Sequence, residues 1–127
     1  MTILDTDILV AHLRRRKEAA IALAAVEDPK FSSITRFELY RGIAGQDDEL
    51  AKAIMVDRLL KKFAELPLDP RVCLFSARVY ESLREDGQEV GLADAVIAGT
   101  GLAHRETVVS RNAKHFKRVE GLRWRSW

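Results

Sequence analysis

Short apolar runs alternate along the chain with longer segments whose apolar residues recur at helical spacing. The runs that predict strands or short extended pieces are residues 3–4, 31–34, 65–68, 107–110 and 122–127. The segments that predict helices are residues 6–16, 17–27, 35–45, 47–64, 69–86 and 91–103, with a short turn at 112–116. Strands that alternate with helices favour an α/β fold with a mostly parallel sheet, and the length suits one domain of residues 1–127.

Two helix starts carry recognisable capping signals. Thr6 or Asp7 is expected to cap the first helix, and Thr35-x-x-Glu38 fits a capping box, in which the glutamate reaches back to the cap N–H. Asp69 is expected to cap the helix that follows it, with Pro70 at the first helical position.

The apolar residues of three helices predict which faces are buried. The helix at 47–64 is amphipathic, with five apolar residues on or near one face: Leu50, Ile54, Leu59, Leu60 and Phe63. In the helix at 69–86, Cys73 is expected to be a small core residue rather than a reactive thiol. Gly99-x-Gly101 lies inside a helical pattern and indicates close packing of that helix on its neighbours.

Composition narrows the class of protein. The single Cys73 excludes an intramolecular disulfide and a cysteine-based zinc cluster, and it fits a reducing, cytoplasmic setting. The longest wholly apolar run, Ala19–Val26, is too short to cross a bilayer, and the N-terminus lacks a secretory signal pattern, so no membrane association is expected.

Basic residues are concentrated in two places although the net charge is only +2. Residues 105–127 carry seven Lys or Arg against two Glu, and a second basic cluster is Arg14-Arg15-Arg16-Lys17. Such clusters permit a polyanionic partner, while solvated helix faces explain either of them equally well.

Three carboxylates and an amide occupy comparable places relative to the predicted strands. Asp5 ends the first strand, Glu38 and Asp94 lie in the first turns of helices, and Asn112 follows the strand at 107–110. Each acid alone has an ordinary explanation as a helix cap or a group that complements a helix dipole. Together at one sheet edge they would repel one another unless a cation intervened, and hard oxygen ligands favour Mg²⁺ or Mn²⁺ over Zn²⁺.

Other chemistries lack their sequence patterns. The serines have no G-x-S-x-G elbow, no G-x-x-x-x-G-K phosphate loop occurs, and His12, His104 and His115 are not spaced as a metal motif. A receiver-like phosphoacceptor domain also carries acids at a sheet edge, but the residues after Val109 are Ser110-Arg111 instead of the lysine that such a domain needs.

Four segments together resemble one family. They are Leu4-Asp5-Thr6-Asp7-Ile8-Leu9, Ile34-Thr35-x-x-Glu38-Leu39-x-x-Gly42, Leu92-Ala93-Asp94-Ala95-x-Ile97-Ala98 and Val109-Ser110-Arg111-Asn112-x-x-His115-Phe116. In this order and spacing, and with the Gly121-Leu122-x-x-x-x-Trp127 ending, they resemble the PIN-domain ribonucleases, and most of all the VapC toxins of toxin–antitoxin pairs. The resemblance implies a three-layer PIN-like fold, RNA cleavage by two-metal-type phosphodiester hydrolysis, a homodimer, and a cognate VapB-like antitoxin.

The resemblance also implies roles for individual residues. Asp5, Glu38 and Asp94 match the acidic ligands of Mg²⁺ or Mn²⁺, and Asn112 is a fourth catalytic position at which many relatives carry an acid. His115 falls where a further Asp is common, so these two departures leave a second metal site open.

Two neighbouring positions match supporting groups in the family. Ser110 matches a position that is usually a Thr hydroxyl. Asp7 matches a position that is often Asn and is expected to be a supporting hydrogen-bond or outer-shell group, with metal binding as the less favoured alternative. The alternative function is a catalytically degenerate PIN-like binding or regulatory module, which the missing fourth acid favours.

Overall fold

The computed structural model describes residues 1–127, apart from the side chain of Ala113. A five-stranded sheet runs through it in the order β3-β2-β1-β4-β5, and every pairing is parallel. The strands are β1 (Thr2–Leu4), β2 (Pro29–Ser32), β3 (Ala64–Leu66), β4 (Thr107–Val109) and β5 (Trp124–Arg125). The parallel α/β prediction is confirmed, and β1 is the central strand.

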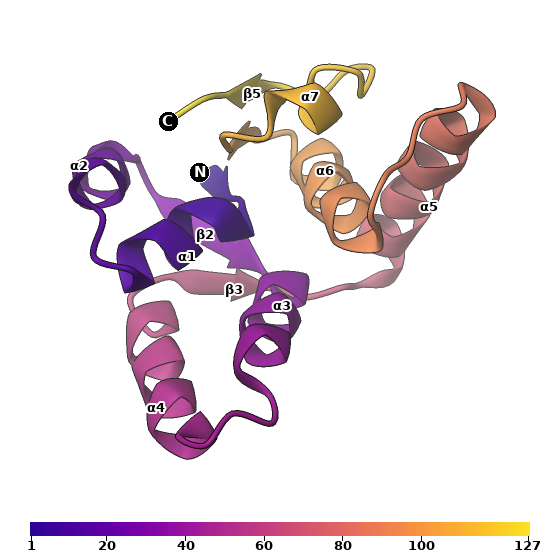
Figure 1. Cartoon of the computed structure of the whole chain (residues 1–127). Helices are drawn as coiled ribbons and strands as arrows, with labels where there is room; N and C mark the ends of the chain where they lie inside the picture. The colour runs from indigo at the N-terminus through magenta and orange to yellow at the C-terminus, as the bar shows by residue number, and fades with distance from the viewer.

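Helices connect the strands and cover both faces of the sheet. They are α1 (Thr6–Leu13), α2 (Lys17–Ala25), α3 (Ser33–Ile43), α4 (Glu49–Leu60), α5 (Pro70–Glu85), α6 (Leu92–His104) and α7 (Ala113–Phe116). In Figure 1, α5 and α6 stand together on one side, while α1 to α4 lie on the other. No helix of the described residues is long and apolar enough to cross a membrane.

Alternation along the central strands divides the core between the two faces. Ile3 of β1 and its neighbour Val108 of β4 pack with α5, α6 and α7. Leu4 and its neighbour Val109 point the opposite way and pack with α1, α3 and α4. These paired alternations produce the three layers.

Two helix starts differ from the sequence prediction. Strand β2 ends at Ser32, whose hydroxyl caps α3 by accepting the Ile34 N–H at 3.2 Å. The capping box at Thr35 and Glu38 is therefore wrong, because α3 has already begun at Ser33. The cap of α1 is Asp5, which accepts the Thr6 N–H at 2.7 Å. This confirms the explanation of Asp5 as a helix cap, and the expectation that Thr6 or Asp7 has that role is wrong.

Two predicted buried positions are exposed instead. Helix α4 is shorter than 47–64, and its residues Leu50 and Ile54 are 77% and 47% exposed, because α4 packs through Leu59, Leu60 and Val56. Cys73 is also exposed, so its assignment to the core is wrong. The buried stripe of α5 is narrow and contains Val72, Ser76, Val79 and Leu83, next to which Cys73 is turned toward solvent.

Close packing of α5 on α6 matches the small residues of α6. A Cβ atom added to Gly99 would lie 2.6 Å from the Ser76 Cα, and one on Gly101 would lie 2.8 Å from side-chain atoms of Leu122 and Val108. These short distances confirm the packing role of the two glycines.

Candidate acidic active site

Asp5 lies at the carboxyl end of the central strand and is only 4% exposed. Its carboxylate accepts the Thr6 N–H at 2.7 Å and the Ser110 hydroxyl at 2.6 Å. Burial, together with the negative charges of Asp7 and Asp94, raises the pKa of Asp5 to about 7, although the two hydrogen bonds oppose this shift. A buried carboxylate with other acids nearby is a group that a cation would stabilise.

Asp7 is held by donors from the segments that follow the last two strands, β4 and β5. One of its oxygens accepts the Arg111 N–H at 2.8 Å and lies 3.2 Å from the Ser110 hydroxyl oxygen, and the other accepts the Trp127 indole N–H at 3.0 Å. Asp7 therefore ties the first turn of α1 to the segments that follow β4 and β5.

Glu38 is oriented by a short chain of hydroxyl groups. The Thr6 hydroxyl donates to a Glu38 carboxylate oxygen at 2.6 Å, and the Thr35 hydroxyl lies 3.0 Å from the Thr6 oxygen. Since Thr6 uses its hydrogen on Glu38, Thr35 donates to Thr6. Sequence reasoning missed this role of Thr6, although its position next to Asp5 on α1 was a usable signal.

Asp94 is held from the segment after β4. The Asn112 amide nitrogen lies 3.4 Å from an Asp94 oxygen, and the same oxygen lies 2.5 Å from His115 Nδ1. A carboxylate only accepts, so His115 Nδ1 carries the hydrogen of that contact. The segment with Asn112 and His115, which resembles the fourth family motif, is thus in contact with Asp94.

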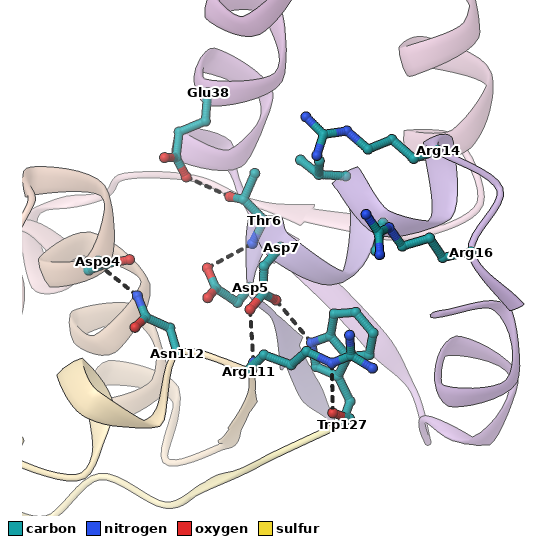
Figure 2. Close-up of a pocket in the computed structure, with 12 residues that line it drawn as sticks. Asp5, Thr6, Asp7, Arg14, Arg16, Glu38, Asp94, Arg111, Asn112 and Trp127 are labelled. Atoms are coloured by element: carbon teal, nitrogen blue, oxygen red, sulfur yellow. Dashed lines mark hydrogen bonds between the residues drawn. The ribbon is translucent and has the colours of Figure 1, made fainter. Parts of the chain in front are cut away.

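One open cleft of about 590 Å³ gathers these groups. The four residues predicted from sequence all line it: Asp5, Glu38, Asp94 and Asn112. In Figure 2 Asp5 faces the cleft from the junction of β1 and α1, Glu38 and Asp94 face it from α3 and α6, and Asn112 reaches toward Asp94. His115 does not line this cleft; it lines a neighbouring hollow with Lys114 and Arg118.

The donor set suits a hard divalent cation, but the side chains are not drawn together around one point. Among the described residues, no group of three His, Cys, Asp or Glu is close enough to hold a metal ion. Glu38 is turned to Thr6 and Asp94 to His115, and each keeps a second carboxylate oxygen outside those contacts. Carboxylate oxygens on a shared cleft are the ligands that Mg²⁺ and Mn²⁺ prefer.

The opposite wall of the cleft is basic and aromatic, and it consists of Arg14, Arg16, Arg111 and Trp127. Of the basic residues in 105–127, only Arg111 is among the lining residues of this cleft, and the other two arginines come from the cluster after α1. The sequence had linked neither Arg14 nor Trp127 with the acids. The register of β5 on β4 explains the position of Trp127, because the pairing of Arg125 with Val109 brings residue 127 to the same sheet edge as Arg111.

Comparisons with known proteins find a matching family model and similar chains. A family model described as PIN domain matches residues 2–122. Toxin FitB of Neisseria gonorrhoeae is 30% identical over 137 residues, covering 100% of this chain and 99% of that protein. Ribonuclease VapC1 of Haemophilus influenzae is 25% identical over 128 residues, covering 98% and 96%. The structure of VapBC2 from Rickettsia felis, bound to a DNA fragment from their promoter, superposes with a TM-score of 0.88 at 23% identity, covering 99% of this chain and 98% of that one.

Proposed function

This chain belongs to the PIN-domain family, and from that premise we propose that it is a metal-dependent endoribonuclease of the VapC toxin type. The observation that carries the proposal is the gathering of Asp5, Glu38, Asp94 and Asn112 on one cleft at the carboxyl end of a parallel sheet. The relatives named as a ribonuclease and a toxin support the reaction and the biological role.

Asp5, Glu38 and Asp94 are the proposed ligands of Mg²⁺ or Mn²⁺. Such cations, when bound, activate water and stabilise the attacking and leaving oxygens of phosphodiester hydrolysis. The chain's own hydrogen bonds orient the ligands: Ser110 and the Thr6 N–H hold Asp5, and the Thr6 hydroxyl holds Glu38.

Cleavage of RNA with and without a chelator tests this function. Purified protein should cleave single-stranded RNA in Mg²⁺ or Mn²⁺, lose the activity in EDTA and regain it on addition of excess metal. Asp94→Asn should remove cleavage while the protein stays folded by circular dichroism. Asp69→Asn keeps a helix cap that does not line the cleft, so this variant should cut RNA normally. Cleavage that persists in EDTA would contradict the proposed metal mechanism.

The proposed partner is a VapB-like antitoxin that blocks the cleft. An apolar groove of about 470 Å³ between α1, α3 and α4 adjoins the cleft, and the two share Val10, Arg14 and Glu38. An apolar segment of a partner could lie in this groove and extend an arginine to the acids, since guanidinium pairs well with carboxylate.

Expression in cells tests the toxin and antitoxin roles. When the chain is expressed alone in the cytoplasm, it should arrest cell growth, and Asp5→Ala should restore growth. The small protein encoded next to it should form a complex with it in size exclusion. Failure of the two purified proteins to co-elute would contradict the proposed pairing.

A homodimer is a further part of the proposal. The resemblance to VapC toxins supports it, and so do the large apolar side chains that stand exposed on α3 and α4, namely Phe37, Leu50, Ile54 and Met55. Sedimentation of the purified chain should give the mass of two copies, and a monomer across the micromolar range would contradict this expectation.

The second candidate function is a degenerate PIN-like binding module without catalysis. The observations that favour it are Asn112 at a usually acidic position and the separation of the described carboxylates beyond metal-binding range. A protein of this kind would bind Mn²⁺ poorly and leave RNA intact at every metal concentration.

A further inference from the structure

We propose that the basic–aromatic wall of the cleft, made of Arg14, Arg16, Arg111 and Trp127, is a subsite for a nucleotide that flanks the cleaved phosphate. In this arrangement the Arg111–Trp127 pair stacks an unpaired base, and Arg14 and Arg16 hold phosphate groups. The inference rests on the proposed function, because it names the kind of RNA that the cleft accepts.

The turn after α1 fixes the two phosphate-binding arginines. The Arg15 N–H bonds to the His12 carbonyl at 3.0 Å, and the Arg16 N–H bonds to the Ala11 carbonyl at 3.1 Å. This bonding pattern is a Schellman motif, which usually places glycine at its left-handed position, yet here Arg15 occupies that position with φ 59°. Arg14 and Arg16, on either side of Arg15, line the cleft, while Arg15 is not among the lining residues.

Arg14 and Arg16 have no acidic partner of their own among the described residues. None of the ion pairs within 4.0 Å in that part of the structure involves either guanidinium. Both side chains are exposed at the edge of an open cleft. Guanidinium groups in this state suit phosphate oxygens, which they can bind in a bidentate manner.

Arg111 and Trp127 form a flat stacked surface. The Arg111 guanidinium carbon lies 3.6 Å from the centroid of the Trp127 ring, and Arg111 Nε donates to the Trp127 carbonyl at 3.0 Å. Both residues are also bonded to Asp7, through the Arg111 N–H and the Trp127 indole N–H. The surface is therefore fixed on the same carboxylate that lies two residues from Asp5.

A stacked arginine and indole is the kind of surface that proteins use for nucleobases. Any base can stack on an aromatic ring or on a guanidinium plane, so such a surface selects for unpaired nucleotides rather than for one sequence. Bases inside a duplex have both faces covered by their neighbours. The wall therefore favours single-stranded or looped RNA, with the flanking base on Trp127 and Arg111 while the cleaved phosphate meets the acids.

Fluorescence of Trp127 tests the stacking directly. The chain contains two tryptophans, so Trp124→Phe leaves Trp127 as the single reporter. In EDTA, where cleavage is not expected, a short mixed-sequence single-stranded oligoribonucleotide should quench this fluorescence as it binds. The same strand annealed to its complement should quench at least about fivefold less at equal concentration, because its bases are already stacked.

Anisotropy with the same labelled oligoribonucleotide tests the arginines. The double variant Arg14→Ala and Arg16→Ala should raise Kd about tenfold, and the slope of log Kd against log salt should fall by about 1.4, since each phosphate contact on a single strand contributes about 0.7. Arg15→Ala is the matched control, because it removes one charge from the same turn, and it should change Kd by less than about twofold.

Two substitutions separate stacking from the hydrogen bond to Asp7. Trp127→Leu should raise Kd at least about fivefold, and Trp127→Phe, which keeps a ring and loses the N–H, should keep most of the affinity. Each variant is compared with the parent by circular dichroism.

The Trp124→Phe protein keeps all four residues of the wall. If the oligoribonucleotide does not quench its fluorescence, the proposal is overturned. Equal Kd for the arginine double variant and Arg15→Ala would overturn it as well. If RNA binding behaves as stated but the protein cleaves no RNA with any metal, the subsite stands and the nuclease function is wrong. If the protein cleaves RNA but shows none of these binding effects, the nuclease function stands and the subsite is wrong.

Discussion

The contact between α5 and α6 and the acidic end of the sheet both bring groups unusually close together, with opposite consequences. At the helix contact, Gly99 lies against Ser76 so tightly that a Cβ atom would be 2.6 Å from the Ser76 Cα. At the sheet end, Asp5 is buried among carboxylates and its pKa is raised to about 7. Close packing of apolar surfaces stabilises the fold, whereas close packing of like charges opposes it.

The difference separates residues that serve the fold from residues that serve the site. Substitution at the helix contact should lower stability, while neutralising an acid at the sheet end should raise the stability of the metal-free protein and remove its activity. The retention of a destabilising arrangement at the sheet end is what a functional site requires.

The largest expected effect is at Asp5. The raised pKa means that the folded state keeps a proton that the unfolded chain releases near pH 3.8, so the contribution of this carboxyl group to stability is full below about pH 4 and is lost as the pH rises through 7. Asp5→Asn should therefore stabilise the protein in EDTA at pH 8, by up to about 4 kcal/mol if the whole pKa difference is realised. Urea unfolding at pH 8 measures this, and asparagine still caps α1.

The same pair of proteins compared at low pH provides the control for Asp5. Near pH 4 the wild-type carboxyl is protonated in the folded state, so the stabilisation by Asp5→Asn should largely disappear. A gain in stability that stays constant between pH 4 and pH 8 would mean that the substitution acts through packing and not through charge.

The helix contact should respond in the opposite direction. Gly99→Ala should lower the free energy of unfolding by about 1–3 kcal/mol, because the added methyl group meets the backbone of α5. Gly42→Ala is the matched control in α3, where an added Cβ has no neighbour within 4 Å, and it should stabilise by about 0.5–1 kcal/mol. Equal effects of the two substitutions would contradict the packing role of Gly99.

Substitution of Asn112 should give a smaller effect, and here the change adds negative charge to the acidic region. Asn112→Asp places a fourth carboxylate beside Asp94 and should tighten Mn²⁺ binding about tenfold in calorimetry, or about 1.4 kcal/mol. Unchanged metal affinity in Asn112→Asp, together with full activity of Asn112→Ala, would remove position 112 from the site.

His115 should give the smallest effect. It holds one oxygen of Asp94 and lies outside the lining of the acidic cleft, so His115→Ala should slow cleavage only a few-fold, as measured by initial rates on RNA. A loss of a thousandfold or more would instead assign His115 a direct part in the reaction.

The sequence predicted the alternating strands and helices of the fold because strand and helix periodicities are local. Ile3 and Leu4 belong to a short apolar run, and the Ala- and Gly-rich pattern around Gly99 indicated a tightly packed helix. The errors occurred where local patterns compete. Ser32 reads as part of a strand, yet its hydroxyl caps α3, and the apolar spacing of Leu50 and Ile54 does not say whether anything covers them.

The acids of the candidate site were predictable, whereas the wall opposite them was not. Parallel strands bring residues such as Asp5 and Asn112 to one edge whatever their separation in sequence. Arg16 and Trp127 reach the cleft through a left-handed turn at Arg15 and through the register of β5 on β4, and neither feature is visible in residue spacing.

The central claim is that Asp5, Glu38 and Asp94 form one metal site that serves RNA cleavage, and calorimetric titration of Mn²⁺ tests it most directly. Wild-type protein should bind Mn²⁺ with a defined stoichiometry, Asp94→Asn should lose most of that affinity, and RNA cleavage should rise with metal occupancy in the wild type alone. Equal Mn²⁺ affinity in the two proteins, or cleavage without bound metal, would contradict the account.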